Sequence, residues 1–395
     1  MKKIFYLPVF FIAASCTVQK PDDLQKVQVQ AHTVVPAERK PSNEFAARLV
    51  TLPGFKVNVY AEGLENPRMI AVGEDDRLYV TLKKAGKVVT LKDNNGDGRA
   101  DDQKEIASGL KDVHGITIRN NKMYLATPTE LYDADLQANG NITTPRKLLN
   151  DLPDGGQHPN RTIAFGPDGK LYVSVGSTCN ACKEPNKEHA TILIMDADGK
   201  NRKVFAKGLR NTVGFDWHPQ TKELWGWDHG SDMRGDNIPP EELNKIDEGK
   251  DYGWPFVWGN REIDRVMAQA PDDKTKEEYA RETEPAVLTY TAHSAPMAFK
   301  FYNGNQFPAE YRNTAFMAFR GSWNRNPPSG YKIAHVRFDA NGRPVEVRDF
   351  ITGFLSSNGT EQFGRLAGVA VGNDGSLYFT DDHNGIVYKV TYTGN

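Results

Sequence analysis

The chain has 395 residues, of which 38% are hydrophobic and 25% are charged, a composition typical of a folded globular protein rather than a disordered or fibrous one. Its 49 Lys and Arg residues nearly balance 51 Asp and Glu residues, so the net charge of −2 provides no field for binding nucleic acid or an anionic membrane surface. Three cysteines are too few for a disulfide framework.

The N-terminus has the pattern of an export signal. Lys2 and Lys3 precede an apolar run over residues 4–14, and small residues then lead into Cys16. This pattern predicts a lipoprotein-type signal peptide over residues 1–16, with Cys16 lipidated as the first mature residue. An ordinary signal peptide with a cysteine near its cleavage point is the alternative. The run is too short to span a bilayer permanently. Both interpretations predict an exported, periplasmic or cell-surface protein, which the first attaches to the membrane through a lipid anchor only.

Residues 17–44 are polar, contain three prolines and show no sustained hydrophobic period. Such a composition predicts a flexible tether that separates a folded body, residues 45–395, from the membrane.

One pattern recurs along this body, in which an apolar strand and a turn rich in Asp, Asn, Gly or Pro precede a strand with an aromatic centre. The aromatic centres are spaced 45, 48, 53, 91 and 62 residues apart. Blades of four strands occupy about 40 to 50 residues each, so the spacing predicts an all-β, six-bladed β-propeller that forms a single domain. The six second strands are residues 78–80, 123–125, 171–173, 224–226, 315–317 and 377–379.

Two segments explain departures from a simple repeat. Residues 55–60 alternate with a period of two, and we expect them to complete the last blade beside residues 386–390. The long fourth step contains a charged stretch at about residues 259–285, with Ile263, Val266 and Met267 at helical spacing. This stretch is therefore predicted to be an insertion that covers one face.

Two local motifs are open to more than one interpretation. Cys179 and Cys182 predict a local disulfide in an oxidising compartment, with a redox role as the less favoured alternative. Lys183 follows where a covalent haem site needs His, which disfavours haem attachment. Residues 93–101 copy the start of a Ca²⁺ loop, but Lys104 stands at its twelfth position, so a hairpin turn is the favoured interpretation.

Polar side chains precede the inner strands of the third and fourth units. His158 lies in such a loop, which in a propeller lines the mouth of the central channel, so His158 is a candidate base. Its alternative is an ordinary surface histidine. Arg210 and Asn211 occupy the corresponding place in the next unit and suit an anionic or quinone-bearing ligand, the alternative being a salt bridge between blades.

Further motifs follow in a fixed order. They are His229-Gly230-Ser231-Asp232, Glu241-Glu242-Leu243-Asn244, Tyr252-Gly253-Trp254-Pro255, His293-Ser294-Ala295-Pro296 and Phe319-Arg320-Gly321-Ser322-Trp323. On this ordered set the sequence resembles the pyrroloquinoline-quinone-dependent glucose/sorbosone dehydrogenase family, which includes soluble aldose sugar dehydrogenases, and it looks most like the sorbosone-dehydrogenase branch. The resemblance extends over roughly residues 53 to 392.

The resemblance implies a six-bladed propeller that holds pyrroloquinoline quinone (PQQ) and Ca²⁺ at its channel. It implies that His158 is the base for the substrate hydroxyl, and that Arg210 and Asn211 contact the quinone. Gly230 and Ser231 fall where backbone carbonyls bind Ca²⁺, although the glucose branch has Pro in place of Ser231. Arg320 and Arg365 match cations that face the cofactor carboxylates, with Arg320 replacing a Lys.

Glu241 replaces the family's Asp, and its longer side chain has an undetermined reach. Three further residues, His114, His293 and Trp323, are candidates for substrate contact, whereas His114 and His293 are equally interpretable as structural. Trp254 is interpreted as a structural plug because buried aromatic side chains normally serve packing.

The leading hypothesis is thus an exported quinoprotein that oxidises a sugar or a related alcohol or aldehyde by hydride transfer to PQQ. Its electrons pass to an external acceptor, a cytochrome or a quinone. One alternative is a metal-dependent lactonase or esterase on the same architecture, which needs convergent carboxylate ligands. Another is a carbohydrate-binding propeller without catalysis.

Overall fold

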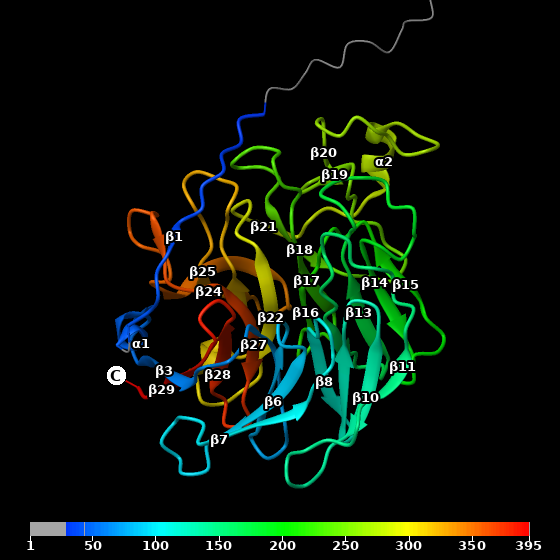
Figure 1. The fold of residues 1–395 in the computed structure, drawn as a ribbon. Coiled ribbons are helices and arrows are strands. Elements are labelled where there is room, and N and C mark those ends of the chain that lie inside the picture. The colour runs from blue at the N-terminus through cyan, green and yellow to red at the C-terminus, as the bar shows by residue number, and fades with distance from the viewer. Residues whose placement is uncertain (1–28, 43, 395) are drawn as a thin grey trace, which may run out of the picture.

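The computed structural model describes residues 29–42 and 44–394, in which six antiparallel sheets surround a central channel as the blades of a β-propeller (Figure 1). This architecture confirms the predicted fold. The signal peptide and Cys16 lie outside the described residues. Among the residues described, no helix combines the length and apolar character that crossing a membrane requires.

The first three blades each contain four consecutive strands. Their strands are β4 (Pro67–Val72), β5 (Leu78–Leu82), β6 (Lys87–Lys92) and β7 (Asp102–Ala107) in blade 1; β8 (Gly115–Arg119), β9 (Lys122–Ala126), β10 (Leu131–Asp135) and β11 (Arg146–Leu149) in blade 2; and β12 (Ile163–Phe165), β13 (Leu171–Val175), β14 (Thr191–Met195) and β15 (Lys203–Lys207) in blade 3.

The other three blades are interrupted or completed by distant segments. Their strands are β16 (Gly214–Trp217), β17 (Leu224–Asp228), β18 (Glu241–Lys245) and β21 (Leu288–Tyr290) in blade 4; β22 (Pro296–Tyr302), β23 (Thr314–Phe319), β24 (Lys332–Phe338) and β25 (Pro344–Thr352), with β2 (Val50–Thr51) added, in blade 5; and β27 (Leu366–Val371), β28 (Leu377–Asp381), β29 (Ile386–Tyr392) and β3 (Phe55–Ala61) in blade 6. Short elements outside the blades are β1 (Ala37–Glu38), β19 (Val257–Trp258), β20 (Glu262–Ile263), β26 (Glu361–Gln362), α1 (Phe45–Arg48), α2 (Lys276–Glu282) and a 3₁₀ turn (Ala309–Tyr311).

The six strands with aromatic centres are the second strands of the six blades, as the repeat predicts. All five residues of β5, β13, β17 and β28 are buried, because neighbouring blades cover both faces of a propeller sheet. Their aromatic centres join adjacent blades. Tyr124 packs edge-to-face on Phe165 at 4.8 Å, and Tyr172 packs on Trp217 at 5.0 Å. In blades 2 and 3 the recurring aromatic residue is therefore an interblade contact.

The ring closes as the alternating pattern of residues 55–60 predicts. Strand β3 pairs antiparallel with β29, and Val57 lies opposite Val390. The N-terminal strand thereby covers the edge that the last blade would otherwise expose. Phe55 at its start packs edge-to-face on Phe307 and Phe350, so the closure strand also fixes the base of blade 5.

The charged stretch at 259–285 lies in the connection between β18 and β21, but its helix is not where the spacing predicts. Ile263 ends the β19–β20 hairpin, and the carboxylate of Asp264 accepts hydrogen bonds from the backbone of Val266 and Met267, which turns the chain. The helix, α2, begins later, where Thr275 forms a capping box with Glu278.

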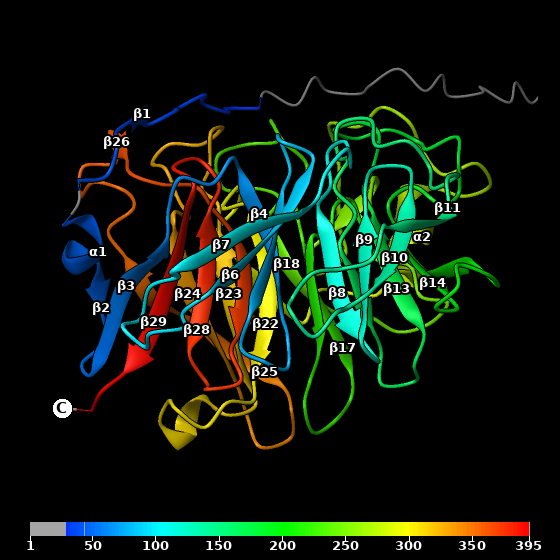
Figure 2. The same ribbon diagram turned by 60° about the horizontal axis from the view of Figure 1, so that its bottom comes forward.

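Residues 29–42 are not the flexible tether that their composition predicts. Figure 2 shows this segment lying along the upper edge of the propeller, where β1 pairs parallel with β26. His32 contacts Asp236 at 2.6 Å, and the backbone N–H of Val34 donates to the carbonyl of Trp323 at 2.9 Å. Backbone hydrogen bonds do not depend on side-chain hydrophobicity, so a polar segment can pair with loop edges without any periodic signal.

Candidate active site

All the candidate residues belong to one rim of the propeller because of strand direction. In each antiparallel blade the first strand begins, and the second strand ends, at the same end of the channel. Below this rim, a cavity of about 570 Å³ in the channel is lined mainly by residues of the six inner strands. At this rim, residues at or before the inner strands are Arg68, His114, His158, Asn211 and Arg365, and residues after the second strands are Lys83, Ser177, His229, Arg320 and Asp382.

His158 is held by Ser177, which follows the second strand of the same blade. Its Nδ1 lies 2.9 Å from both the carbonyl oxygen and the hydroxyl oxygen of Ser177. The carbonyl can only accept, and the hydroxyl donates its own hydrogen to the carbonyl of Cys179 at 2.7 Å. The proton of the imidazole therefore resides on Nδ1, and Nε2 carries a lone pair. Burial and the nearby Arg210 lower the pKa of His158 to about 4, so the ring is neutral at pH 7.

Arg161 fixes the loop that presents His158. Its side chain is fully buried and donates to the carbonyls of Pro153 at 2.7 Å and His158 at 2.9 Å. On the other side, Gly176 makes room for the imidazole. A Cβ at Gly176 would lie 2.5 Å from the Cβ of His158 and 2.9 Å from the Oδ1 of Asn211. The His158 loop and Asn211 thus both pack against Gly176, where no side chain can be accommodated.

Arg210 and Asn211 precede β16, and the buried Asp228 holds their backbone in place. The carboxylate of Asp228 accepts from the backbone N–H of both residues at 2.8 Å and from the hydroxyl of Thr212. Burial raises the pKa of Asp228 to about 6 despite these donors. The guanidinium of Arg210 donates through Nη2 to Asp232 at 2.8 Å, whereas its Nη1 has no partner among the described residues. Two N–H donors of this cation therefore remain for a ligand.

Glu241 connects two turns at the rim. Its side chain, longer than the family's Asp, therefore reaches the backbone of both turns. Its carboxylate accepts from the backbone N–H of Gly230 at 3.1 Å and of Ala295 at 2.8 Å. Burial raises the pKa of Glu241 to about 8. No hydrogen bond between described residues ends on the carbonyl oxygen of Gly230 or Ser231. Both oxygens are available to the carbonyl-type Ca²⁺ site that the resemblance implies.

A cluster of cations lies across the rim from His158. Arg68 and Arg320 both bind the buried carboxylate of Asp382, and Arg365 lies over the ring of Tyr331 at 5.5 Å. Burial and Arg320 lower the pKa of Arg365, as expected where positive charges outnumber negative ones. The Nε of Arg365 is buried and has no hydrogen-bond partner in the part of the chain that the structure describes. An unpaired buried guanidinium N–H indicates a site for an anion.

Lys83 adds a further positive charge to this cluster. Burial and the neighbouring Arg68 lower the pKa of the Lys83 ammonium group. Four cations therefore lie around two buried carboxylates, Asp381 and Asp382, at this part of the rim. This balance favours an anionic ligand with more than one negative group.

Two histidines expected as substrate contacts are occupied by the protein. His114 is 1% exposed, accepts from Arg68 at Nδ1 and contacts the hydroxyl of Thr162 at 3.2 Å through Nε2. His293 contacts the carbonyl of Gly235 at 2.7 Å through Nε2 and the amide of Asn324 through Nδ1. Since both nitrogens of each ring are engaged, the structural interpretation replaces substrate contact for both. Trp323 is 42% exposed at the rim, where a ring can face a ligand.

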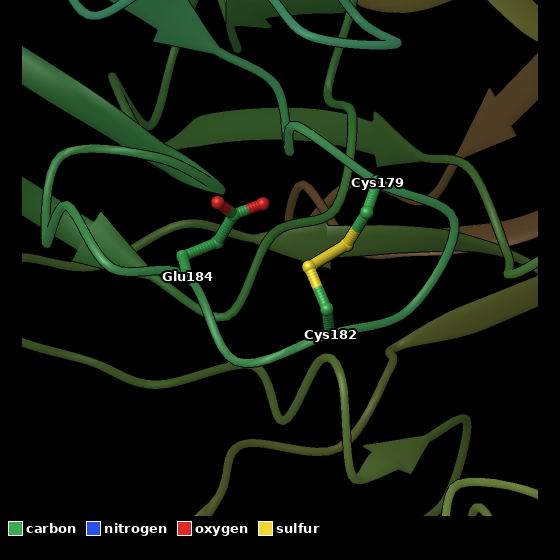
Figure 3. A group of neighbouring side chains, drawn as sticks. All are labelled: Cys179, Cys182 and Glu184. Atoms are coloured by element: carbon green, nitrogen blue, oxygen red, sulfur yellow. A yellow bond between two sulfur atoms is a disulfide. The ribbon is translucent and has the colours of Figure 1, made fainter.

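The predicted disulfide between Cys179 and Cys182 is confirmed (Figure 3). Glu184 lies close to the two sulfur atoms, but its carboxylate accepts from the backbone and hydroxyl of Thr178 at 2.6 and 2.8 Å. The sulfur atoms are bonded to each other, so this group is a covalent loop closure. Residues 93–101 form the favoured hairpin turn between β6 and β7, in which Asp93 accepts from the backbone of Gly96 and Gly98.

Four further residues of the rim were not predicted from the sequence: Arg68, Lys83, Asp382 and Asn180. Arg68 is the second residue of β4 and occupies the place in its blade that His114 and Arg161 occupy in theirs, so aligning the repeats would have found it. Lys83 and Asp382 directly follow second strands, as Arg320 does. No sequence signal distinguishes Asn180, because its partners lie on two other blade loops.

Comparison with known proteins gives a family match over residues 49–393, described as TrAA12-like. An uncharacterized protein of Borreliella burgdorferi is 32% identical over 89% of this chain and 93% of that protein. A pyrroloquinoline quinone-dependent pyranose dehydrogenase of Coprinopsis cinerea is 23% identical over 85% of this chain, which spans only 54% of that protein. The solved holo form of the PQQ domain of the Coprinopsis cinerea pyranose dehydrogenase has the same fold, with a TM-score of 0.72 and 21% identity over 91% of this chain and 100% of that domain.

Proposed function

Because the chain belongs to the TrAA12-like family, we propose that it is a PQQ-dependent sugar dehydrogenase with its active site at the propeller rim. The single observation that carries this proposal is the pairing of a neutral, oriented His158 with a rim that has an excess of buried cations. An oriented neutral base beside a polyanion site suits oxidation of a hydroxyl group by a bound acidic cofactor.

The cation cluster fits the three carboxylates of PQQ. Arg365 has an unpaired buried Nε, and Arg320 and Arg68 share one carboxylate, so each guanidinium retains donors for a ligand. Arg210 has two free N–H groups, which together with the amide of Asn211 suit the quinone oxygens. These residues would hold the cofactor, which supplies the hydride acceptor when bound.

The proposal includes a Ca²⁺ ion bound at the rim. The free carbonyls of Gly230 and Ser231 would bind the ion, and Glu241 supports them by fixing the Gly230 N–H. Main-chain oxygen is a hard ligand of the kind Ca²⁺ prefers. Replacement of the family's Pro by Ser231 leaves such a carbonyl in place.

His158 would remove the proton from the substrate hydroxyl through Nε2. Ser177 holds Nδ1–H, so the imidazole cannot rotate its lone pair away from the rim. With a pKa near 4 the base is free of protons throughout the neutral range, and it releases an acquired proton readily. Trp323 offers an exposed ring beside the mouth, which suits stacking against the apolar face of a pyranose.

The hydrolase alternative finds less support. Within the described residues, the only group of three acidic, histidine or cysteine side chains positioned to share a metal ion contains the disulfide. Asp382 is paired with arginines, and Asp228 and Glu241 are occupied by backbone N–H groups. A carbohydrate-binding propeller without catalysis would not need the oriented lone pair on His158.

Export is also proposed, on the sequence of residues 1–16 and on the disulfide, which forms in oxidising compartments. Mass spectrometry of the mature N-terminus would test lipidation of Cys16, and an unmodified downstream N-terminus would contradict it. An external cytochrome or quinone would then receive the electrons.

The function is tested on exported protein stripped with a chelator and titrated with PQQ, with and without Ca²⁺. Absorbance follows cofactor binding, and dye reduction follows oxidation of a panel of aldoses. Dehydrogenase activity that needs both additions would support the proposal with its Ca²⁺ site. Activity with PQQ alone would remove Ca²⁺ from it, and absence of PQQ binding would overturn it.

A further inference from the structure

The side chain of Asn180 connects three separate parts of the rim. It lies between the two cysteines of the disulfide, in the loop after β13 of blade 3. Its backbone carbonyl accepts from the Nε of Arg210 at 2.9 Å, and its Oδ1 accepts from the Nη2 of Arg210 at 3.0 Å. One residue therefore receives two hydrogen bonds from the guanidinium, which fixes the plane of that group as well as its position.

The same amide also fixes the loop that follows Gly230 and Ser231. The Oδ1 of Asn180 accepts from the backbone N–H of Asp232 at 2.7 Å, and its Nδ2 donates to the carbonyl of Asp232 at 2.9 Å. This pair of bonds resembles one rung of a β-ladder made by a side chain. The carboxylate of Asp232 in turn accepts from Arg210 at 2.8 Å and from Asn324 at 2.7 Å.

The loop of Asn180 also contacts the candidate base. The carbonyl of Cys179 accepts the hydroxyl hydrogen of Ser177, and this bond turns the oxygen of that hydroxyl toward Nδ1 of His158. In addition, the backbone N–H of Ser177 donates to the carbonyl of Arg210 at 2.8 Å. A single short loop thus contacts the side chains assigned to the base and to the quinone.

The disulfide gives this loop a fixed shape. Cys179 and Cys182 are three positions apart in sequence, and their Cα atoms are 6.2 Å apart. A covalent ring of this size removes most alternative backbone conformations of residues 180 and 181. The loop can therefore present two acceptors to Arg210 without a large entropy loss when the site assembles.

We propose that Asn180, confined by the Cys179–Cys182 disulfide, is the positioning residue that orients Arg210 and locks the Gly230–Ser231 turn in place through Asp232. The catalytic consequence rests on the proposed function, whereas the orientation of Arg210 does not. Asn180 acts through Arg210 and Asp232, and it is not assigned a contact with substrate.

The test compares Asn180→Ala with Asn180→Asp and with a Cys179→Ala/Cys182→Ala double variant. Asn180→Asp keeps the acceptor for Arg210 but loses the amide donor to Asp232, so it is the conservative variant. Asn186→Ala is the matched control, because Asn186 is an exposed asparagine after the same disulfide loop and is bonded only to its own turn. All are exported full-length chains, and the Asn180 variants keep the test valid if the cysteine variant fails to fold.

Two readouts separate this inference from the proposed function. Crystal structures without cofactor are expected to show the Arg210 guanidinium displaced in Asn180→Ala and unmoved in Asn186→Ala. PQQ titration is expected to show affinity lowered by about 10- to 100-fold in Asn180→Ala, a smaller loss in Asn180→Asp and none in Asn186→Ala.

A third readout is one that a purely structural role would not change. His158 faces Arg210, Asp232, Arg161 and His229, and Arg210 is the charge that lowers its pKa most. Displacing Arg210 is therefore expected to raise the pKa of His158 and to move the acid limb of kcat/KM to higher pH. An Arg210 that keeps its wild-type position in Asn180→Ala, with unchanged affinity, would overturn the inference. Failure of the wild-type protein to bind PQQ would instead overturn the proposed function and leave the crystallographic comparison to decide the orientation of Arg210.

Discussion

The Nδ1 of His158 donates to the backbone carbonyl of Ser177 over 2.9 Å, and this bond decides which nitrogen of the ring is basic. A carbonyl oxygen has no proton to offer, so the neutral ring must carry its hydrogen on Nδ1. The lone pair on Nε2 is then fixed by the backbone of the same blade.

Replacing His158 by Ala is expected to lower kcat for sugar oxidation by about 10²- to 10⁴-fold, the usual contribution of a positioned general base. PQQ affinity is expected to stay near that of the wild type, because the cation cluster is untouched. Steady-state kinetics and cofactor titration on the same preparation check this prediction. Full turnover in the variant would show that His158 is not the base.

The pH dependence follows from the lowered pKa of His158, which is about 4 compared with 6.5 in an unfolded chain. Protonation of Nε2 removes the base, so kcat/KM is expected to fall below about pH 4 and to be flat through pH 6. The folded state binds fewer protons at this site than the unfolded state, so its stability is complete above pH 6.5 and is lost as pH falls toward 4. Initial rates measured well below the unfolding temperature separate the two effects, and an acid limb near pH 6.5 would contradict the buried environment.

Gly176→Ala is expected to reduce kcat/KM by about 100-fold, because the added Cβ would lie 2.5 Å from that of His158 and must displace its loop. The matched control is Gly73→Ala in the β4–β5 turn, at the opposite end of the blade. There the nearest atoms, in the side chains of Asp75 and Tyr79, are 3.1 Å away, so the added Cβ requires a smaller displacement. Steady-state kinetics of both variants test the close approach of Gly176 to His158. An equal loss of kcat/KM in the two variants would contradict it.

Arg365→Met is expected to weaken PQQ binding by about 10- to 100-fold, since a charge-assisted hydrogen bond contributes about 1.5 to 3 kcal/mol. The loss should be larger at low salt, where the cluster is less screened. Arg348→Met, at a surface pair with Glu346, is the control and should bind normally. PQQ titrations of both variants at several salt concentrations measure the difference. Equal PQQ affinities of the two variants would show that Arg365 does not contact the cofactor.

Removing residues 29–41 is expected to lower Tm by about 2 to 4 °C, for a loss of about 2 kcal/mol in backbone hydrogen bonds and the His32–Asp236 contact. Thermal unfolding of the shortened and full-length chains measures the difference. An unchanged Tm, together with rapid proteolysis of this segment in the intact protein, would support the original prediction of a flexible tether.

The repeat, the closure strand and the disulfide were predictable because each is written in local sequence. Tyr79 and its five equivalents mark the second strands, where Tyr124, Tyr172 and Trp225 pack on aromatic residues of the next blade. Residues 55–60 alternate because one face of β3 is buried. Cys179 and Cys182 are close in sequence, so no fold is needed to bring them together.

The site was only partly predictable. His158, Arg210 and Asn211 belong to motifs, whereas Arg68 and Asp382 become a pair only when blade 6 closes beside blade 1. His114 and His293 look like ligand contacts in sequence, yet their ring nitrogens are occupied by groups 46 and 58 residues away. Hydrogen bonds between residues so far apart in the chain produce no repeating pattern in the sequence.

The sequence by itself determined the number of blades, the strand order and the kinds of side chain at the rim, because these depend on periodicity and on residue chemistry. Only the tertiary structure decided which nitrogen of His158 is basic, that Asn180 orients Arg210, and that residues 29–42 lie across the rim. Each of these depends on hydrogen bonds that form only when the chain has folded, within blade 3 for His158 and between separate loops for Asn180 and residues 29–42.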